Sequence, residues 1–171
     1  AGDCDLQSCA YGLGLRRGSW EVERNSLPIL RDNPFIVRDY NKCIVCGRCV
    51  RVCQEVQGNG VLELKDRGVD TRVGAVADSL EEAGCVFCGN CVQICPTAAL
   101  LPQSRLGKGR EWELQSVRTI CGYCGVGCGI EYAKKDGAII YARGYAEAPV
   151  NGEFLCVKGR FGWDFATSPE R

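Results

Sequence analysis

Short stretches of patterned apolar and polar residues in the first half of the chain predict its first elements. Residues 5–15 predict a short helix, and a polar connection over residues 16–34 follows it. Residues 35–40 alternate apolar and charged side chains, as a short strand does. Residues 61–74 indicate a strand followed by a turn and a loop.

The second half of the chain predicts a separate module. Residues 97–111 are expected to form a linker. Residues 130–144 indicate a β-hairpin, because Asp136 and Gly137 supply the positive φ angles of a tight turn. Residues 156–166 then favour a loop that enters a helix. The pattern therefore predicts short helices and strands in two small modules.

Composition and charge exclude several classes of partner. Apolar residues make up 46% of the chain and charged residues 25%, as in globular proteins. The 21 basic and 21 acidic residues cancel, and neither sign forms a long block, so we expect no nucleic-acid partner. No stretch has the length and apolarity of a membrane span or the pattern of a signal peptide, so no membrane insertion is expected.

Two residue types are absent from the sequence, Met and His. Because Met is absent, we expect that the chain does not begin where its gene does and that it is a processed or excised piece of a larger protein. Without His it lacks the commonest imidazole ligand and the commonest general base. No other side chain is a plausible nucleophile or base, so the sequence predicts no catalytic residue and no bond chemistry.

Cysteine is the most informative residue type here. Fourteen cysteines approach the share that marks a disulfide scaffold or a metal protein. Twelve of them fall in three tight clusters with C-x2-C spacing. This spacing turns thiolates toward one point in a loop, whereas a disulfide between such near neighbours is usually strained. The cysteines therefore indicate metal binding.

Two of the three cysteine clusters form an internal repeat. Residues 43–53 (CIVCGRCVRVC) and 85–95 (CVFCGNCVQIC) match at every Cys and at a shared Gly, with an offset of 42 residues. Gly47 and Gly89 follow the second Cys of each copy, where a bare Cα lets backbone N–H groups approach a cluster. Each copy has the C-x2-C-x2-C-x3-C spacing of bacterial ferredoxins.

In the ferredoxin pattern, three cysteines of one copy hold a cluster and the fourth reaches across to the other cluster. The sequence therefore resembles the two-cluster bacterial ferredoxin domain, a pseudo-twofold α+β unit, over residues 36–105. Two structural zinc sites are the alternative, because C-x2-C pairs also bind zinc. The expected ligands are Cys43, Cys46, Cys49 and Cys95 for the first [4Fe–4S] cluster, and Cys85, Cys88, Cys91 and Cys53 for the second.

The charges beside the two copies differ. Lys42, Arg48 and Arg51 surround the first copy, whereas the second has the neutral neighbours Val86, Phe87 and Asn90. Nearby cations favour the reduced, more negative form of a cluster. We therefore expect the first cluster to have the higher reduction potential of the two.

The third constellation is C-x2-C-x3-C-x27-C, which predicts a four-thiolate site with [4Fe–4S] favoured over zinc. Its segment CGYCGVGCGIEY…GEFLCVKGR resembles the amino-terminal cluster domain of molybdenum- and tungsten-bis-pyranopterin enzymes, such as formate dehydrogenases and periplasmic nitrate reductases. In that family a lysine two residues after the fourth Cys lies between cluster and pterin and assists electron transfer, a place that Lys158 occupies. The plain alternative is a solvated lysine. The expected ligands are Cys121, Cys124, Cys128 and Cys156.

Two cysteines lie outside these sets. The opening AGDCDLQ resembles the end of a cluster motif with one histidine and three cysteines, found in complex I large subunits, iron-only hydrogenases and NAD-linked formate dehydrogenases. Cys4 matches its final cysteine, but the three earlier ligands are absent from the chain, so Cys4 is a possible remnant of that site. Cys9 matches nothing in the motif and is expected to be a packed thiol on the short helix.

The order of the motifs resembles most the alpha subunit of cytosolic NAD- or ferredoxin-linked formate dehydrogenases. Complex I large subunits keep only one of the two ferredoxin clusters, and the eight cysteines here argue against that branch. The expected domains are residues 1–35 (end of the one-histidine, three-cysteine domain and a connection), 36–105 (two-cluster ferredoxin-like) and 106–171 (a small β-rich [4Fe–4S] domain of the bis-pyranopterin oxidoreductase type).

The resemblance implies a cytoplasmic electron relay with three [4Fe–4S] clusters. It would link a Mo or W pterin, bound outside this chain, to flavin/NAD-binding or ferredoxin-reducing subunits of a hetero-oligomeric complex. One alternative is a stand-alone ferredoxin-like electron-transfer subunit of a bifurcating hydrogenase, transhydrogenase or complex I-like assembly. The other is a zinc-stapled interaction module, which would be colourless.

Overall fold

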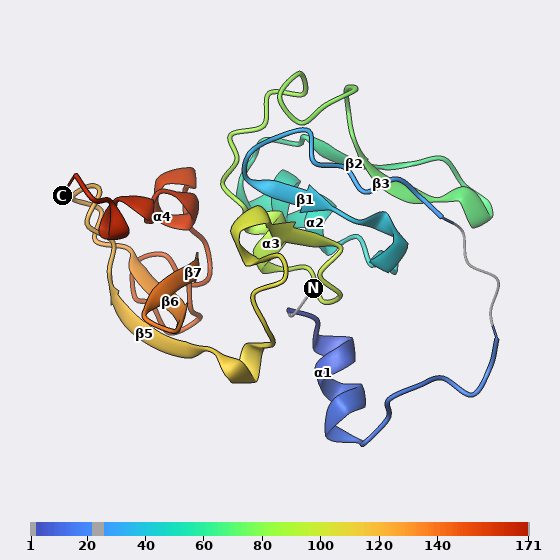
Figure 1. Cartoon of the computed structure of the whole chain (residues 1–171). Helices are drawn as coiled ribbons and strands as arrows, with labels where there is room; N and C mark the ends of the chain where they lie inside the picture. The colour runs from blue at the N-terminus through green and yellow to red at the C-terminus, as the bar shows by residue number, and fades with distance from the viewer. Residues whose placement is uncertain (1–2, 22–25, 171) are drawn as a thin grey trace.

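The computed structural model describes residues 3–21 and 26–170 of the chain. Within these ranges it mixes short helices with three small antiparallel sheets, which confirms the α+β class. Figure 1 shows β5, β6, β7 and α4 on one side of the molecule and β1 to β4 with α2 and α3 on the other. None of the described helices has the length and apolar character needed to cross a membrane.

Two sheets of two strands each frame the first module. β1 (Ile36–Arg38) pairs with β4 (Leu100–Pro102), although more than sixty residues separate them in the sequence. β2 (Leu62–Lys65) pairs with β3 (Arg72–Ala75) as a hairpin. The stretch 61–74 was expected to hold one strand and a loop, but its second half is also a strand.

Two short helices follow the cysteine loops of the repeat. α2 (Arg48–Arg51) continues into a wider π-helical turn (Val52–Val56), and α3 (Asn90–Gln93) is its counterpart in the second copy. Residues between these elements form single 3-10 turns. In the first module the 3-10 turns are Tyr40–Lys42, Gly68–Asp70 and Gln103–Arg105.

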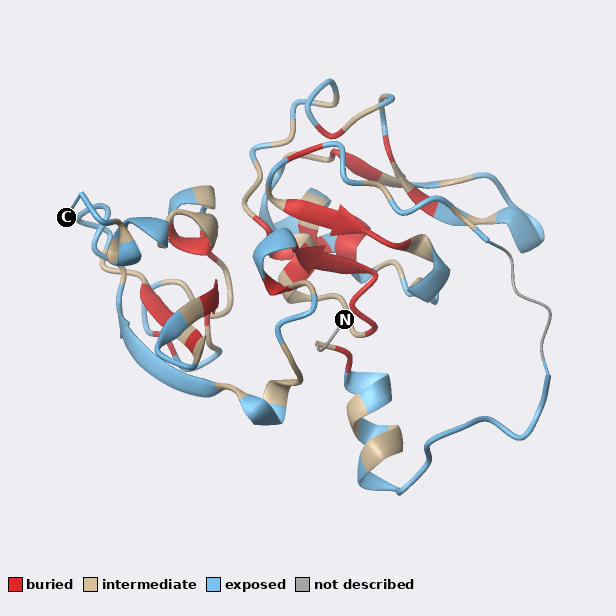
Figure 2. Cartoon of the chain, viewed as in Figure 1, coloured by how far each residue is buried: buried red, intermediate tan, exposed pale blue. Residues whose placement is uncertain are grey.

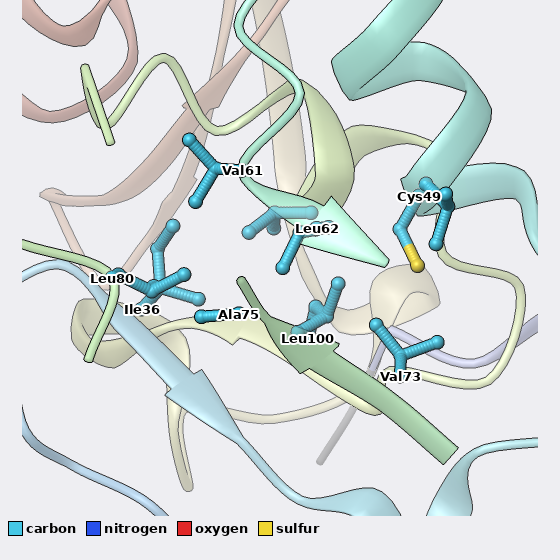
Figure 3. Packing of buried hydrophobic residues seen from close by; sticks show 10 residues of the cluster. Ile36, Cys49, Val61, Leu62, Val73, Ala75, Leu80 and Leu100 are labelled. Atoms are coloured by element: carbon cyan, nitrogen blue, oxygen red, sulfur yellow. The ribbon is translucent and has the colours of Figure 1, made fainter. Parts of the chain in front are cut away.

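The main hydrophobic core lies between the two sheets and the two helices. Figure 3 shows Ile36 and Leu100 from the paired strands packed with Leu62 and Val73 from the hairpin and with Val61, which precedes β2. Each fully buried Val, Leu or Ile contributes about 1.5 to 3 kcal/mol to folding. Cysteines of both copies pack against this core, so the cysteine loops are anchored on its surface.

The expected linker over residues 97–111 is wrong in its first half. Leu100 and Leu101 belong to β4 and are almost fully buried, as are Ala98 and Ala99 before them. The apolar run Ala-Ala-Leu-Leu completes the core because β1 supplies its hydrogen-bonding partner (Figure 2). Only the part after Pro102 connects the modules.

The predicted strand over residues 35–40 is also shorter than expected. β1 keeps only three residues, all buried, and Arg38 is among them at 2% exposure. The guanidinium of Arg38 forms a salt bridge with Asp32. Arg38 is charged and yet buried. The alternation of apolar and charged residues therefore does not show where the strand ends.

The second module is a three-stranded sheet with one helix. β5 (Gln115–Ile120) pairs with β6 (Gly129–Lys135), which pairs with β7 (Ala138–Arg143). The predicted hairpin is confirmed, with Asp136 at φ 52° and Gly137 at φ 81° in its turn. The predicted helix after Cys156 is α4 (Val157–Phe161). Two 3-10 turns flank the module, Glu111–Glu113 and Asp164–Thr167.

A buried polar network joins the two modules at the start of the second. Arg105 has a side chain with no exposed surface, and its Nη2 lies 2.6 Å from Glu111 Oε2. Arg143 of β7 pairs with the other oxygen of Glu111 at 2.8 Å, and the hydroxyl of Tyr141 donates to that oxygen at 2.7 Å. The carboxylate of Glu111 therefore links Arg105, in the connection between the modules, to β7 of the second module.

The first helix, α1 (Asp5–Gly12), ends three residues before its expected limit. Its N-terminal end is attached to the first module, because the N–H of Asp5 donates to the carbonyl of Pro96 at 3.0 Å. No residue of α1 is buried, and the helix is exposed or intermediate along its length (Figure 2).

Candidate iron–sulfur sites

The two copies of the repeat wind their backbones in the same way. In the first, Val45 and Gly47 have φ angles of 53° and 70°, on either side of the second Cys. In the second, Phe87 and Gly89 have φ angles of 50° and 72°. A left-handed conformation costs a β-branched or bulky residue free energy, so it marks a constrained loop. The sequence repeat is therefore a repeat of structure.

This winding turns backbone N–H groups toward cysteine sulfur. The N–H of Val45 lies 3.4 Å from the sulfur of Cys43, and the N–H of Phe87 lies 3.4 Å from the sulfur of Cys85. Such donors stabilise negative charge on sulfur. Gly89 has a second reason to be glycine, because an added Cβ would lie 2.9 Å from the side chain of Arg160.

The structure gathers the eight ferredoxin-type cysteines into two sets of four. One cavity is lined by Cys43, Cys46, Cys49 and Cys95. A second cavity is lined by Cys53, Cys85, Cys88 and Cys91. In each set the fourth cysteine comes from the other copy of the repeat. These are the two sets expected from the sequence, and their role as ligands stays a prediction.

Burial and mutual repulsion disfavour free thiolates in both sets. Burial raises the pKa of Cys49 to about 12, with Cys95, Cys43 and Cys46 adding like-charge repulsion. Burial also raises the pKa of Cys91 well above its usual value, again with repulsion from neighbouring thiols. Four thiolates could coexist in such a place only with a bound cationic centre, which deprotonates its thiol ligands.

The third set of cysteines lies beside the sheet of the second module. The N–H of Cys121 donates to the carbonyl of Cys128 at 2.8 Å, which closes the loop between β5 and β6. Burial raises the pKa of the Cys128 thiol, and repulsion from Cys121, Cys124 and Cys156 raises it further. The four predicted ligands are thus near enough to influence one another. Cys124 and Cys156 are exposed.

Helix α4 brings this third set against the second copy of the repeat. Its first residues follow Cys156, and an added Cβ on Gly159 would lie 3.7 Å from the sulfur of Cys121. The N–H of Leu155 donates to the side-chain oxygen of Asn90 at 3.3 Å. The ring of Phe161 packs on Phe35, with centroids 5.0 Å apart. The third set is therefore the neighbour of the Cys85 loop.

Lys158 and Arg160 lie on different faces of α4. Residues two apart on a helix point roughly 200° apart. Lys158 is exposed, whereas Arg160 is 3% exposed and packs against the second copy of the repeat. Burial lowers the pKa of Arg160 to about 10, while the thiols of Cys88 and Cys91 act in the opposite direction. Arg160 therefore remains a cation at neutral pH.

Arg160 is the functional candidate that sequence reasoning missed. Its guanidinium donates to the side-chain oxygen of Gln93, and its Nε lies 3.5 Å from the carbonyl oxygen of Cys88. Seventy-two positions separate Arg160 from Cys88, and no pattern in the sequence links them. Only its place four residues after a cluster cysteine could have drawn attention to it.

The two remaining cysteines behave differently from each other. Cys4 is buried beside Ala98 and Leu101, and its sulfur accepts a hydrogen bond from the N–H of Gln7 at 3.4 Å. It caps α1 next to Pro96, and its link to a further cluster stays a prediction. The expectation for Cys9 is wrong, because its thiol is exposed instead of packed. No residue of α1 is buried, and Cys9 shares this exposure.

The donor chemistry of the three sets fits [4Fe–4S] clusters. Each set supplies four cysteines, the ligand number and type that such clusters use. The two cavities of the first module are lined mainly by apolar side chains and backbone, which shield a cluster from water. Among the described residues, no group of three or more Cys, Asp or Glu has the arrangement of a site for a single metal ion.

Comparison with known proteins gives two family matches within the chain. Residues 33–101 match the ferredoxin-like domain of NADH-quinone oxidoreductase subunit 3. Residues 114–168 match the molybdopterin oxidoreductase Fe4S4 domain. Both modules are therefore of iron–sulfur type, and the second is of the kind that the sequence resemblance indicated.

Individual relatives cover almost the whole chain. The chain is 41% identical over 172 residues to an NADH-quinone oxidoreductase subunit of Rhizobium meliloti. This match covers 99% of the chain and 20% of that protein. The chain is 34% identical over 214 residues to a putative formate dehydrogenase of Bacillus subtilis, covering 99% and 22%. The chain thus spans about a fifth of the length of these curated relatives.

A solved structure shows a similar arrangement. A chain in the crystal structure of an NAD⁺-reducing [NiFe]-hydrogenase, in its H₂-reduced state, has a TM-score of 0.50 and 30% sequence identity. The match covers 60% of the present chain and 44% of the hydrogenase chain. The chain is therefore similar to parts of several classes of redox enzyme.

Proposed function

Because this chain belongs to the iron–sulfur region of molybdopterin oxidoreductase-type subunits, we propose that it is an electron relay with three [4Fe–4S] clusters. The observation that carries the proposal is the gathering of the ferredoxin-type cysteines into two crossed sets of four, with a third set packed against one of them. One-electron transfer is the chemistry that such clusters supply when bound.

The residues of this chain would hold and space the three sites. The contacts from α4 and Leu155 to the second copy make the site of Cys85 the neighbour of the third set. The crossed cysteines Cys53 and Cys95 join the site of Cys85 to the site of Cys43. Electrons would therefore move in the order third set, Cys85 site, Cys43 site, or in reverse.

The Cys43 site would be the exit toward a redox partner. Cys46 is exposed, and its neighbours Ile44 and Val45 are 57% and 37% exposed. An exposed apolar rim beside a cluster ligand suits a partner that must come within tunnelling distance. The Cys4 segment is bonded to Pro96, directly after Cys95, so a cluster that includes Cys4 would stand next in line at this end. A flavin- or NAD-binding subunit of a hetero-oligomeric, cytoplasmic complex is the expected partner.

The donor at the other end would be a Mo or W pterin outside this chain, and its substrate formate or, in reverse, CO₂. The similarity to a putative formate dehydrogenase and the molybdopterin-type domain support this assignment. Lys158 is exposed on the face of α4 opposite to Arg160, where it can meet a pterin-binding part of the protein. We expect Lys158 to have no bond-making role and the substrate site to lie outside this chain.

A second candidate is a relay of the NADH-quinone oxidoreductase type without formate chemistry. The match of residues 33–101 and the 41% identity to the Rhizobium meliloti protein favour it. The two candidates share the clusters and differ in the substrate. Formate-dependent reduction of NAD⁺ or ferredoxin by the complete protein with its partner subunits separates them.

The relay itself is tested by metal content. Anaerobically purified protein should contain about 12 iron atoms per chain with matching acid-labile sulfide, because three clusters hold four irons each. It should be brown and bleach on reduction. About eight irons would remove the third cluster from the proposal. Three zinc ions and no iron would replace the relay with a structural zinc module.

A further inference from the structure

A buried arginine lies between the third set of cysteines and the second copy of the repeat. Arg160 is anchored on α4, four residues after Cys156, and its side chain reaches Gln93 and the carbonyl of Cys88. Its Nη2 also lies 3.5 Å from the carbonyl oxygen of Glu153. Three neutral oxygens therefore hold the guanidinium beside the second copy of the repeat. The aliphatic part of the Arg160 side chain lies against Gly89, which lines the cavity of Cys85 and Cys88.

Arg160 forms no salt bridge with a carboxylate among the described residues, although Asp3 and Asp5 line one cavity with it. Arg38, which lines the cavity of the second cysteine set, is in contrast paired with Asp32. The cations beside the first copy are either paired with a carboxylate or exposed to solvent. Lys42 is paired with Asp39 at 2.5 Å, and Arg48 and Arg51 are exposed, where water and salt screen their charge.

A buried cation acts strongly on a nearby redox centre. Electrostatic interactions are stronger in the protein interior than in water, since the effective dielectric constant is lower. Adding an electron to a cluster adds negative charge, so an adjacent cation stabilises the reduced form. Arg160 Nε lies 3.5 Å from the carbonyl oxygen of Cys88, and the Arg160 side chain lies against Gly89, the next residue, so its charge is beside the loop that carries Cys88 and Cys91.

We propose that Arg160 raises the reduction potential of the cluster held by Cys53, Cys85, Cys88 and Cys91, an inference that rests on the proposed relay. It is a positioning residue for charge and is not a ligand. This acts against the order of potentials expected from the sequence, which considered only cations adjacent to each copy of the repeat. With Arg160 in place, the central cluster of the relay holds an electron more readily than it would without this charge.

The sharpest variant leaves Arg160 in place and cancels its charge. Gln93→Glu puts a carboxylate on the guanidinium and keeps the contact between α3 and α4. If Arg160 acts through charge, Gln93→Glu should lower the reduction equilibrium constant of this cluster at least tenfold, which is 59 mV for a one-electron couple. If Arg160 only pins the modules together, the new salt bridge should leave the potential unchanged.

Five further variants complete the measurement, which is redox-titrated EPR of the cluster-loaded protein. Arg160→Gln should lower the same potential as Gln93→Glu, and Arg160→Lys should keep most of it. Arg48→Gln is the matched control, because it removes an exposed arginine beside the first copy. It should change the reduction equilibrium constant of each cluster by no more than about threefold. Cys46→Ser and Cys88→Ser identify the signals, since a changed ligand alters the spectrum of its own cluster.

The results separate the inference from the proposed function. Full iron content with equal potentials in wild type, Gln93→Glu and Arg160→Gln would overturn the role of Arg160 and leave the relay standing. A shift of equal size in the clusters of both copies would also overturn it, because the charge would then not be local. Wild-type protein without iron–sulfur signals would overturn the relay itself.

Discussion

Single side chains set the charge around each site, and the two cations of α4 show how. Lys158 and Arg160 are two residues apart, yet one is in solvent and the other is enclosed. The helix therefore presents a positive charge at each of two faces, toward different neighbours. Sequence resemblance identifies Lys158 because it stands at a fixed offset from Cys156. It could not identify Arg160, whose partners Gln93 and Cys88 are distant in the sequence.

Lys158 gives a prediction at the residue scale. In the complete protein, Lys158→Ala should lower turnover by about tenfold or more, equivalent to about 1.4 kcal/mol per tenfold. Iron content and the EPR spectrum should stay the same, since no ligand is lost. Lys158→Arg should recover only part of the rate, because a guanidinium is flatter and bulkier than an ammonium. Steady-state formate oxidation is the measurement.

The control for this prediction is Lys108→Ala. Lys108 is also exposed but lies in the connection between the modules, away from the cysteine loops. It should leave the rate unchanged. Equal rates in wild type and Lys158→Ala would make Lys158 an ordinary surface lysine, and the third cluster would need another route to its donor.

Helices and strands could be predicted where the local sequence pattern marks them. The hairpin of β6 and β7 was predicted because its turn residues force positive φ angles, and the structure has them. Strand β5 was missed because all six of its residues are exposed, so no apolar face marks it. It exists through its pairing with β6, a contact that a single stretch of sequence does not contain. Strand β4 was taken for a linker because its partner, β1, is also distant in the sequence.

Side-chain pairs between β5 and β6 compensate for the exposure of β5. Arg118 stands opposite Glu131 in the register, and Glu131 also accepts a hydrogen bond from Arg143 of β7 at 2.7 Å. Burial opposes the charge of Glu131, but hydrogen bonds from Arg118 and Arg143 outweigh it and lower the pKa of this carboxyl. A group whose folded pKa is lowered contributes its full stability above the pKa of the unfolded chain. At pH 7 this contribution is therefore present.

We expect Glu131→Gln to loosen β5. Hydrogen bonds to charged groups contribute about 1.5 to 3 kcal/mol, so β5 amides should exchange with deuterium about tenfold faster or more at pH 7. Glu147→Gln is the matched control, because Glu147 also pairs with Arg118 but is 70% exposed at the side chain. Its effect should stay within about threefold. Equal protection of β5 in wild type and Glu131→Gln would show that backbone pairing alone holds the strand.

For the whole molecule, the repeat makes one unit of segments that are far apart in the sequence. β1 pairs with β4, the helices of both copies pack on one core, and each cavity takes a cysteine from the other copy. This crossing could be predicted because the spacing of the cysteines resembles the ferredoxin pattern, in which the fourth cysteine of each copy reaches the other cluster. The packing of the second module on the Cys85 loop, through Leu155 and Arg160, could not be predicted because no repeat or spacing encodes it.

The crossing gives the most direct test of the whole arrangement. Cys95 lies in the second copy of the repeat, but it lines the cavity of Cys43, Cys46 and Cys49. Cys95→Ala should therefore damage the first cluster, and its EPR spectrum should match that of Cys46→Ala and differ from that of Cys88→Ala. The reciprocal variant, Cys53→Ala, should instead match Cys88→Ala. Cys9→Ala is the control, because Cys9 is exposed on α1 and outside every set, so all three signals should remain.

A Cys95→Ala spectrum that matched Cys88→Ala would mean that each copy binds its own cluster. The two cavities would then be mixtures of ligand and bystander thiols, and the electron path through the first module would have to be redrawn.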